Sequence, residues 1–166
     1  MDIDQSDVYE KLMALAIRFV SYRPRSEKEI RDYLAQKLSR SHTAAPLVLS
    51  RVLIRLRELH YINDQEFSIW WVGQRTGRKP KGSRMIRMEL ARKGIAPEII
   101  DEVVYEGMRG EQSEVNLAKR VVSKKRDAWK YLPLPEQKRK LVDYLLRSGF
   151  SSEISWGVVD DILTNV

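Results

Sequence analysis

A helical pattern that recurs at intervals of 56 and then 55 residues constrains the fold of this 166-residue chain more than any other feature. The first copy has apolar and basic residues at Ile30, Leu34 and Lys37. The second and third copies match each other more fully, at Ile86, Leu90, Arg92, Gly94, Ile95 and Glu98 and at Leu141, Leu145, Arg147, Gly149, Phe150 and Glu153. Units of this size enclose little core alone, so we expect them to be stabilised by stacking on neighbours.

Apolar residues recur at helical spacing along nearly the whole chain, and no stretch of useful length alternates as a strand would. Ser26 and Glu29 have the spacing of a capping box, in which each residue bonds the backbone amide of the other. Gly94 and Gly149 suit the left-handed position just beyond a helix. The pattern predicts helices over residues 7–22, 26–39, 45–60, 64–76, 82–93, 97–107, 111–129, 134–148 and 151–164.

These observations predict an all-α fold built as an elongated, curved array of three tandem three-helix repeats, similar to helix-turn-helix units. We expect the repeats to occupy residues 1–62, 63–108 and 109–166. The alternative is an ordinary helical bundle, in which leucines also recur at helical spacing. The ending shared by residues 92–95 and 147–150, a basic residue, one further residue, glycine and an apolar residue, favours repetition.

Residues for catalysis or metal binding are scarce. The chain has no cysteine, and its two histidines are His42, in a polar link, and His60, expected at the end of a helix. Asp160 and Asp161 have no third acidic or histidine partner at a metal-ligand spacing, and no glycine-rich phosphate-binding motif is present. We therefore expect neither an enzyme nor a bound cofactor or metal.

The chain contains no segment that predicts export or membrane insertion. Its first ten residues are acidic and lack the pattern of a secretory signal, and its longest apolar run covers only Leu12–Ile17. The absence of cysteine gives no sign of an oxidising compartment. We expect a cytoplasmic protein without membrane contact.

Positive charge is concentrated in two windows. The chain has 30 basic and 23 acidic residues, a net charge of +7, yet residues 73–95 and 117–140 each carry +7, so the remainder carries −7. Such polarity favours an anionic partner, although a solvated basic face without a partner is the alternative. The candidate contact residues are Arg75, Arg78, Lys79, Lys81, Arg84, Arg87, Arg92, Lys93, Lys119, Arg120, Lys124, Lys125, Arg126 and Lys130.

Aromatic residues near these windows have two interpretations. Trp70 and Trp71 share a helix face with Phe67, which favours a core position over ligand contact. Trp129 and Tyr131 lie in a lysine-rich link and are either exposed functional residues or packing residues.

Three stretches resemble the RecX family of bacterial regulators of the RecA recombinase, and the resemblance covers Tyr9 to Leu163. They are ALAIRFVSYRPRSEKEIRDYLAQK, residues 14–37; LRELHYINDQEF, residues 56–67; and KGSRMIRMELARKGI, residues 81–95. The sequence departs from the family pattern at Ala96, where a serine or threonine cap is more usual, and in QKLSRSHTAAP, which lacks a glycine after the helix.

The resemblance implies a regulator that binds RecA filaments on single-stranded DNA. From the two basic windows we also expect weak contacts to acidic protomer surfaces or to nearby DNA phosphates. Such a protein modulates, usually by inhibition, filament extension and the ATPase, recombinase and coprotease activities of RecA, and so acts in DNA repair, homologous recombination and the SOS response. A monomer is expected. The alternative is a direct nucleic-acid-binding regulator of helix-turn-helix type, although no repeat shows an evident set of base-reading residues.

Overall fold

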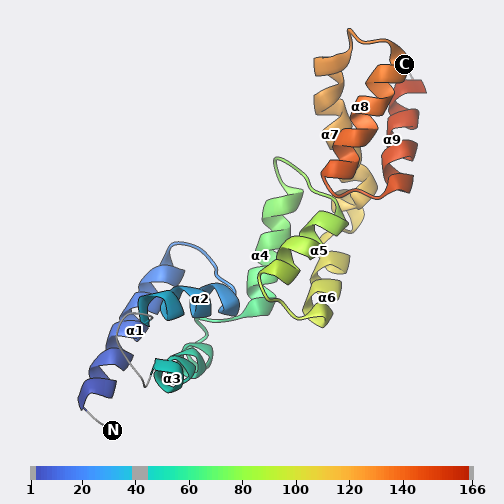
Figure 1. Cartoon of the computed structure of the whole chain (residues 1–166). Coiled ribbons are helices and arrows are strands. Elements are labelled where there is room, and N and C mark those ends of the chain that lie inside the picture. Colours follow the sequence, from blue (N-terminus) through green and yellow to red (C-terminus); the bar gives the residue numbers. More distant parts are fainter. Residues whose placement is uncertain (1–2, 39–44, 165–166) are drawn as a thin grey trace. The chain divides into compact units, whose positions relative to one another are not determined.

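The computed structural model describes residues 3–38 and 45–164, and all the regular secondary structure within these ranges is helical (Figure 1). The helices are α1 (Ile3–Ser21), α2 (Glu27–Leu38), α3 (Ala45–Glu58), α4 (Asp64–Thr76), α5 (Ser83–Arg92), α6 (Pro97–Gly107), the 3-10 helix η1 (Gly110–Gln112), α7 (Glu114–Trp129), α8 (Leu134–Arg147) and α9 (Ser152–Thr164). The expected all-α fold is confirmed, whereas the elongated, curved arrangement stays a prediction.

The chain divides into two compact units. The first unit comprises Met1–Trp70 with Lys93–Ile95, and the second comprises Trp71–Arg92 with Ala96–Val166. The division falls within α4, between Trp70 and Trp71. The expected repeat boundaries after residues 62 and 108 stay predictions.

Two helix starts differ clearly from the expectation, since α1 begins at Ile3 rather than residue 7 and α7 begins at Glu114 rather than residue 111. The sequence predicted a continuous helix over residues 111–129, but η1 precedes a separate helix α7. The backbone leaves the helical region at Ser113, whose ψ is 148°, and this residue separates η1 from α7. Ser113 then caps α7, because its hydroxyl oxygen accepts a hydrogen bond from the amide of Asn116 at 3.4 Å.

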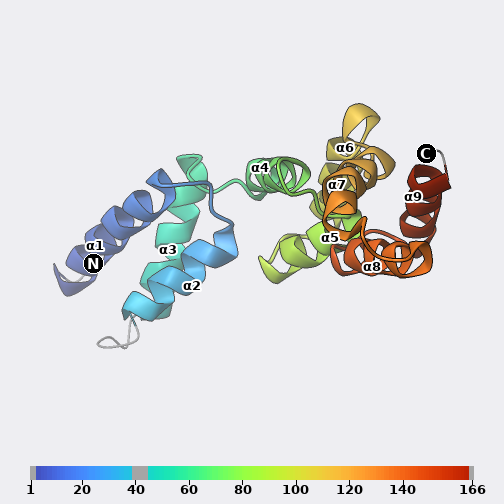
Figure 2. The ribbon, with the colours of Figure 1, turned by 90° about the horizontal axis from the view of Figure 1, so that it is seen from above.

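The first unit is a bundle of α1, α2 and α3 around one apolar core (Figure 2). Its fully buried side chains include Ile30, Leu34 and Leu56. The predicted capping box at the start of α2 is confirmed, because the Ser26 hydroxyl accepts from the amide of Glu29 and the Glu29 carboxylate accepts from the amide of Ser26, each at 3.2 Å. The helix therefore begins where the sequence indicated.

The turn after α3 confirms the expectation for His60. This residue has a left-handed backbone, with a φ of +59°, two positions after the helix ends at Glu58. The amides of Tyr61 and Ile62 both donate to the carbonyl of Leu56, at 2.8 and 3.3 Å. These bonds satisfy a carbonyl that the end of the helix leaves open.

The second unit contains a core formed by α7, α8 and α9, which pack side by side (Figure 1). Leu117, Leu145 and Phe150 are among its fully buried side chains. Gly149, with a φ of +91°, occupies the left-handed position predicted for it after α8. Ahead of α6, Ala96 makes no side-chain capping bond, in agreement with its departure from the family pattern.

A close backbone approach joins the start of α5 to the end of α8. The amide of Gly82 donates to the carbonyl of Ser148 at 3.0 Å. A Cβ atom on Gly82 would overlap the carbonyl group of Gly149, and a Cβ atom on Gly149 would overlap Met85. The Glu114 carboxylate adds two contacts to α5 by accepting from the amide and hydroxyl of Ser83, at 2.9 and 2.8 Å.

Replacing Gly82 tests this approach. We expect Gly82→Ala to lower the free energy of unfolding by about 1–3 kcal/mol, because the added methyl group meets backbone atoms. Urea denaturation followed by circular dichroism measures the change. The matched control is Gly73→Ala within α4, where a Cβ meets nothing within 4 Å and alanine should stabilise by about 0.5–1 kcal/mol. Equal stability of the two variants would contradict the proposed constraint.

Candidate functional site

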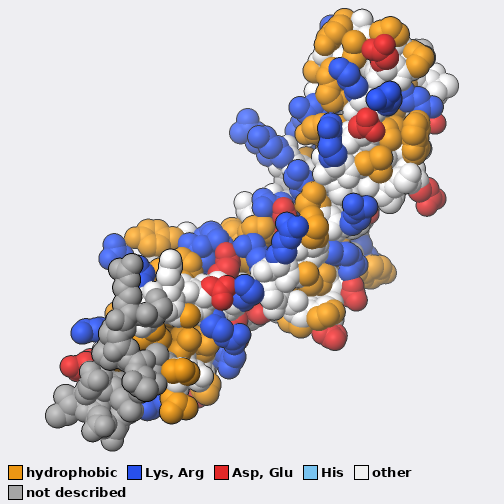
Figure 3. Space-filling model, in the orientation of Figure 1, with side chains coloured by type: hydrophobic (Ala, Val, Ile, Leu, Met, Phe, Trp, Pro, Cys, Tyr) orange, Lys and Arg blue, Asp and Glu red, His pale blue; other side chains and the backbone are white. Residues whose placement is uncertain are grey.

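The second unit contains a basic cavity of about 520 Å³ between the loop that joins α4 to α5 and the helices α7 and α8. Residues from both charged windows line it, together with three uncharged residues. The lining residues are Arg78, Lys79, Pro80, Lys81, Val121, Lys124, Lys125 and Tyr144. Figure 3 shows basic side chains gathered over this loop and the adjoining part of α7 and α8. The fold thus brings together five of the sequence-predicted basic residues.

Helix α7 fixes the shape of the loop. The Arg120 guanidinium donates to the carbonyls of Thr76 and Gly77, at 3.3 and 2.8 Å, and so satisfies the end of α4. The Lys124 ammonium donates to the carbonyl of Arg78 at 3.3 Å. The amide of Lys81, in the loop, donates to the carbonyl of Arg75, in the last turn of α4, at 2.8 Å. The cations of the loop are therefore held on an ordered backbone.

An apolar wall completes the basic cavity. Pro80 and Val121 are buried, and the ring of Tyr144 lies 4.9 Å from the Lys125 ammonium. Trp129 meets the Tyr144 ring edge-on, with ring centroids 6.2 Å apart. The cation–π contact orients Lys125 without neutralising its charge.

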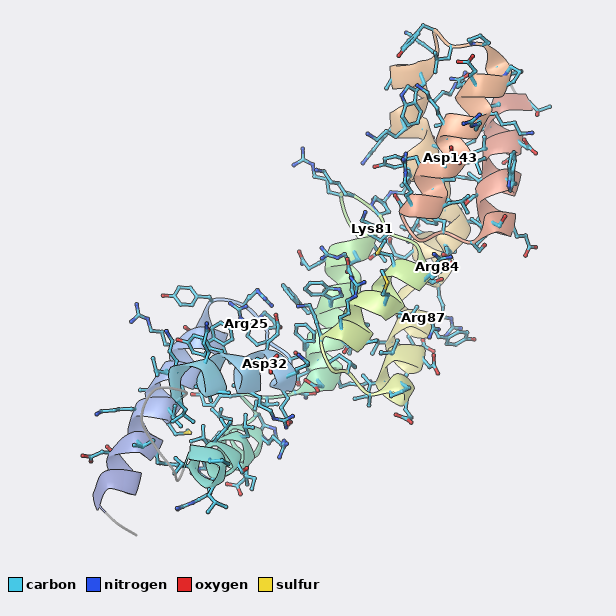
Figure 4. The ribbon with its side chains drawn as sticks, viewed as in Figure 1. Arg25, Asp32, Lys81, Arg84, Arg87 and Asp143 are labelled. Atoms are coloured by element: carbon cyan, nitrogen blue, oxygen red, sulfur yellow. The ribbon has the colours of Figure 1, made fainter. Side chains whose placement is uncertain are left out.

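The absence of acidic side chains from its lining distinguishes the basic cavity from two other cavities. A cavity of about 460 Å³ in the first unit includes Glu66 beside Arg23 and Arg25. A cavity of about 500 Å³ along α8 includes Glu136 and Asp143, the latter labelled in Figure 4. Because like charges close together repel, the basic cavity favours an anionic occupant more strongly than either mixed cavity.

Four other predicted basic residues are engaged in ion pairs. Arg75 contacts Glu89 at 2.6 Å, Lys93 contacts Glu29 at 2.9 Å, Lys119 contacts Asp161 at 2.8 Å, and Arg87 contacts Asp101. Each partner carboxylate offsets the positive charge that the sequence suggested was available. Arg120 is likewise committed to the carbonyls at the end of α4.

The remaining candidates do not line the basic cavity. Arg84, Arg92 and Lys130 are exposed, and Arg126 is half-buried. Figure 4 places Lys81 where the loop meets α5, and Arg84 and Arg87 farther along that helix.

Sequence reasoning missed the uncharged lining of the basic cavity. Pro80 lies between two lysines, a position that could have indicated a fixed turn. Tyr144 lies in α8, where an apolar spacing indicates core rather than a cavity wall. Of the aromatic residues considered, Tyr131 is 75% exposed and Trp129 is half-buried. Trp71 is half-buried and donates to Glu89 at 2.8 Å.

The structure brings together no metal-binding group of three or more His, Cys, Asp or Glu side chains within residues 3–38 and 45–164. His42 lies outside these ranges. No helix in the described part of the chain is long and apolar enough to cross a membrane.

The Glu29 carboxylate is the most strongly perturbed acid in the first unit. Burial opposes its ionisation, but hydrogen bonds from Arg23, Lys93 and the amide of Ser26 outweigh burial and lower the pKa from 4.5 to about 2. The donor atoms of Arg23 and Lys93 each lie 2.9 Å from the carboxylate. Lys93 is therefore part of the packing around α2, although the sequence suggested a partner contact.

Three family models match the chain in the order that the repeats predict. They describe the first, second and third three-helix domains of RecX and match residues 13–38, 63–104 and 112–159. The chain belongs to the RecX family. The resemblance seen in the sequence is confirmed, and so is the construction from three-helix domains.

Curated relatives extend this match over most of the chain. The regulatory protein RecX of Listeria innocua is 34% identical over 154 residues, which are 93% of this chain and 55% of that protein. The regulatory protein RecX of Bacillus cytotoxicus is 31% identical over 145 residues, or 87% and 51% of the two chains. This chain therefore spans about half the length of the curated relatives it matches. Both are named as regulatory proteins.

Solved structures show the same fold. The crystal structure of RecX from Lactobacillus salivarius matches with a TM-score of 0.78 at 22% identity and covers 96% of this chain and 99% of its own. A second crystal structure, of a regulatory protein RecX, matches with a TM-score of 0.78 at 24% identity, over 96% and 74%. This RecX family chain thus shares the fold of these two solved structures.

The low pKa of Glu29 predicts acid sensitivity. A carboxylate whose pKa falls from 4.5 to about 2 on folding contributes stability above pH 4.5 that is lost as the pH drops toward 2. Glu29→Gln should remove this contribution, so urea midpoints at pH 5 and pH 3 should differ less than in the unsubstituted chain. The control is Glu10→Gln, an exposed position in α1. An unchanged difference in Glu29→Gln would contradict the assignment.

Replacing Arg120 tests whether this residue holds the loop between α4 and α5 in place. Arg120→Ala should lower the free energy of unfolding by about 1–3 kcal/mol, because carbonyls at the end of α4 lose a charged donor. Amide hydrogen exchange in residues 77–82 should also become faster. Lys130→Ala, at an exposed position after α7, serves as the control. Unchanged exchange in Arg120→Ala would show that α7 does not fix the loop.

Proposed function

We propose that this chain binds RecA filaments on single-stranded DNA and limits their extension. The observation that carries the proposal is the series of three RecX domains between residues 13 and 159. On this proposal the chain has no catalytic activity and acts in the cytoplasm as a regulatory subunit of the filament. Its binding lowers the ATPase, recombinase and coprotease activities of RecA.

Serial modules suit a repetitive partner. A filament presents the same surface on successive protomers, so two linked modules that each bind weakly have a high effective concentration for one another. Modest contacts then add to a useful total affinity. The basic cavity supports the proposal further, because a concentrated positive charge accelerates association with an anionic assembly.

The second candidate, a direct regulator that reads duplex DNA, is favoured by the same basic cavity. Sequence readout in the major groove uses side chains that pair with base edges, above all arginine, asparagine and glutamine. The charged lining of the basic cavity consists instead of four lysines and one arginine. Such a set suits phosphate contacts, which carry no sequence information, so we favour the filament.

ATP hydrolysis by RecA on circular single-stranded DNA tests the proposal. Hydrolysis should fall when this chain is added well below one copy per RecA protomer, because one regulator that stops extension affects many protomers. A coupled assay measures the rate while the chain is titrated. Co-sedimentation of the chain with assembled filaments provides a second readout.

Two controls separate the candidates. Added excess single-stranded DNA should leave the inhibition in place; if the inhibition disappears, the chain was only sequestering DNA. Sequence-specific binding to a duplex with unchanged ATP turnover would support the second candidate and reject the first.

A further inference from the structure

We propose that the basic cavity of the second unit binds the sugar-phosphate backbone of a single nucleic-acid strand, without regard to sequence. The inference deepens the proposed function, because a RecA filament holds such a strand, yet the binding itself is measurable without RecA. The five cations that would contact phosphates are Arg78, Lys79, Lys81, Lys124 and Lys125.

Charge balance sets these five residues apart from the candidates that are engaged in ion pairs. Among the residues that the structure describes, none of the five has a carboxylate in an ion pair, whereas Arg75, Lys93 and Lys119 do. No acidic side chain lines the basic cavity. An anion that enters therefore gains attraction without displacing a carboxylate.

The cavity is also ordered before a ligand arrives. Arg120 and Lys124 bind carbonyls of the loop, and the amide of Gly82 is fixed on Ser148. A site whose backbone is already in place loses less entropy on binding. Lys124 uses one donor on the loop at 3.3 Å and keeps other ammonium hydrogens for a phosphate.

Size and lining favour a single strand over a flat acidic protein surface. A volume of about 520 Å³ lies in the range of sites that enclose a small ligand, and a flexible strand can enter where a flat surface cannot. Phosphates follow one another closely along a strand and match a cluster of five cations. Pro80, Val121 and Tyr144 provide an apolar wall for a sugar or base of any identity.

Fluorescence anisotropy with a labelled oligothymidine, in the absence of RecA, tests the site. Lys79→Gln/Lys81→Gln should weaken strand binding by about tenfold, because two phosphate contacts are lost. The slope of log affinity against log salt should become shallower by about 1.4, at about 0.7 per contact with a single strand. Arg78→Gln, at an exposed position, is a second variant that should lower affinity and slope in the same direction.

The matched control is Lys11→Gln/Lys37→Gln, which changes net charge equally at exposed positions of the first unit. It should bind the strand as the unsubstituted chain does. Circular dichroism and urea midpoints verify that the variants remain folded. Equal weakening in the test and control variants would overturn the proposal, because total charge rather than the cavity would then govern binding.

Three further outcomes would support or overturn the strand site. Failure of the unsubstituted chain to bind the oligothymidine would overturn the strand site, even if the chain inhibits RecA. Cavity-dependent strand binding without an effect on ATP hydrolysis would support the site and reject the proposed function. Loss of filament binding with unchanged strand affinity in Lys79→Gln/Lys81→Gln would overturn the strand site and assign the cavity to an acidic protein surface.

Discussion

The backbone contact between Gly82 and Gly149 is the constraint on which the second unit depends. It leaves no room for a side chain on either residue, so the start of α5 and the end of α8 meet at the distance of touching backbones. The loop that precedes α5 is thereby carried against α7 and α8, where the basic cavity forms. Larger residues at these two positions would push the start of α5 away from the end of α8 and so change the shape of the cavity.

Helix α7 divides its positive charges between two tasks. Arg120 is close to the carbonyl end of α4, where a cation also interacts favourably with the helix dipole. Lys124 and Lys125, one turn later, line the basic cavity. The same helix thus orders the loop and faces the space that the loop encloses. Because the ordering bonds go to backbone carbonyls, loop side chains such as Arg78 and Lys79 stay exposed.

Local features could be predicted from the sequence, and long-range partners could not. The capping box of Ser26 and Glu29 and the left-handed Gly149 depend on residues close in sequence, and the structure contains both. The pairing of Lys93 with Glu29 spans 64 positions, so nothing near Lys93 reveals it. The charge of residues 73–95 and 117–140, counted from the sequence, therefore overstates the positive charge that is available to a partner. Lys93 and Lys119 are paired with carboxylates that lie outside these two windows.

Several residues in the stretches that resemble the family make contacts that stabilise the fold. In the first stretch, Glu29 collects bonds from Arg23, Ser26 and Lys93, and in the third, Gly82 and Ser83 make the contacts to the end of α8 and to Glu114. These residues indicate which fold the chain adopts, because the groups that they contact belong to other parts of the same chain. The loop ahead of the third stretch contributes its side chains to the basic cavity instead, and only Lys81 belongs to both. Recognition of the family therefore follows from the packing residues, whereas the proposed strand site also uses Arg78 and Lys79, which lie outside all three stretches.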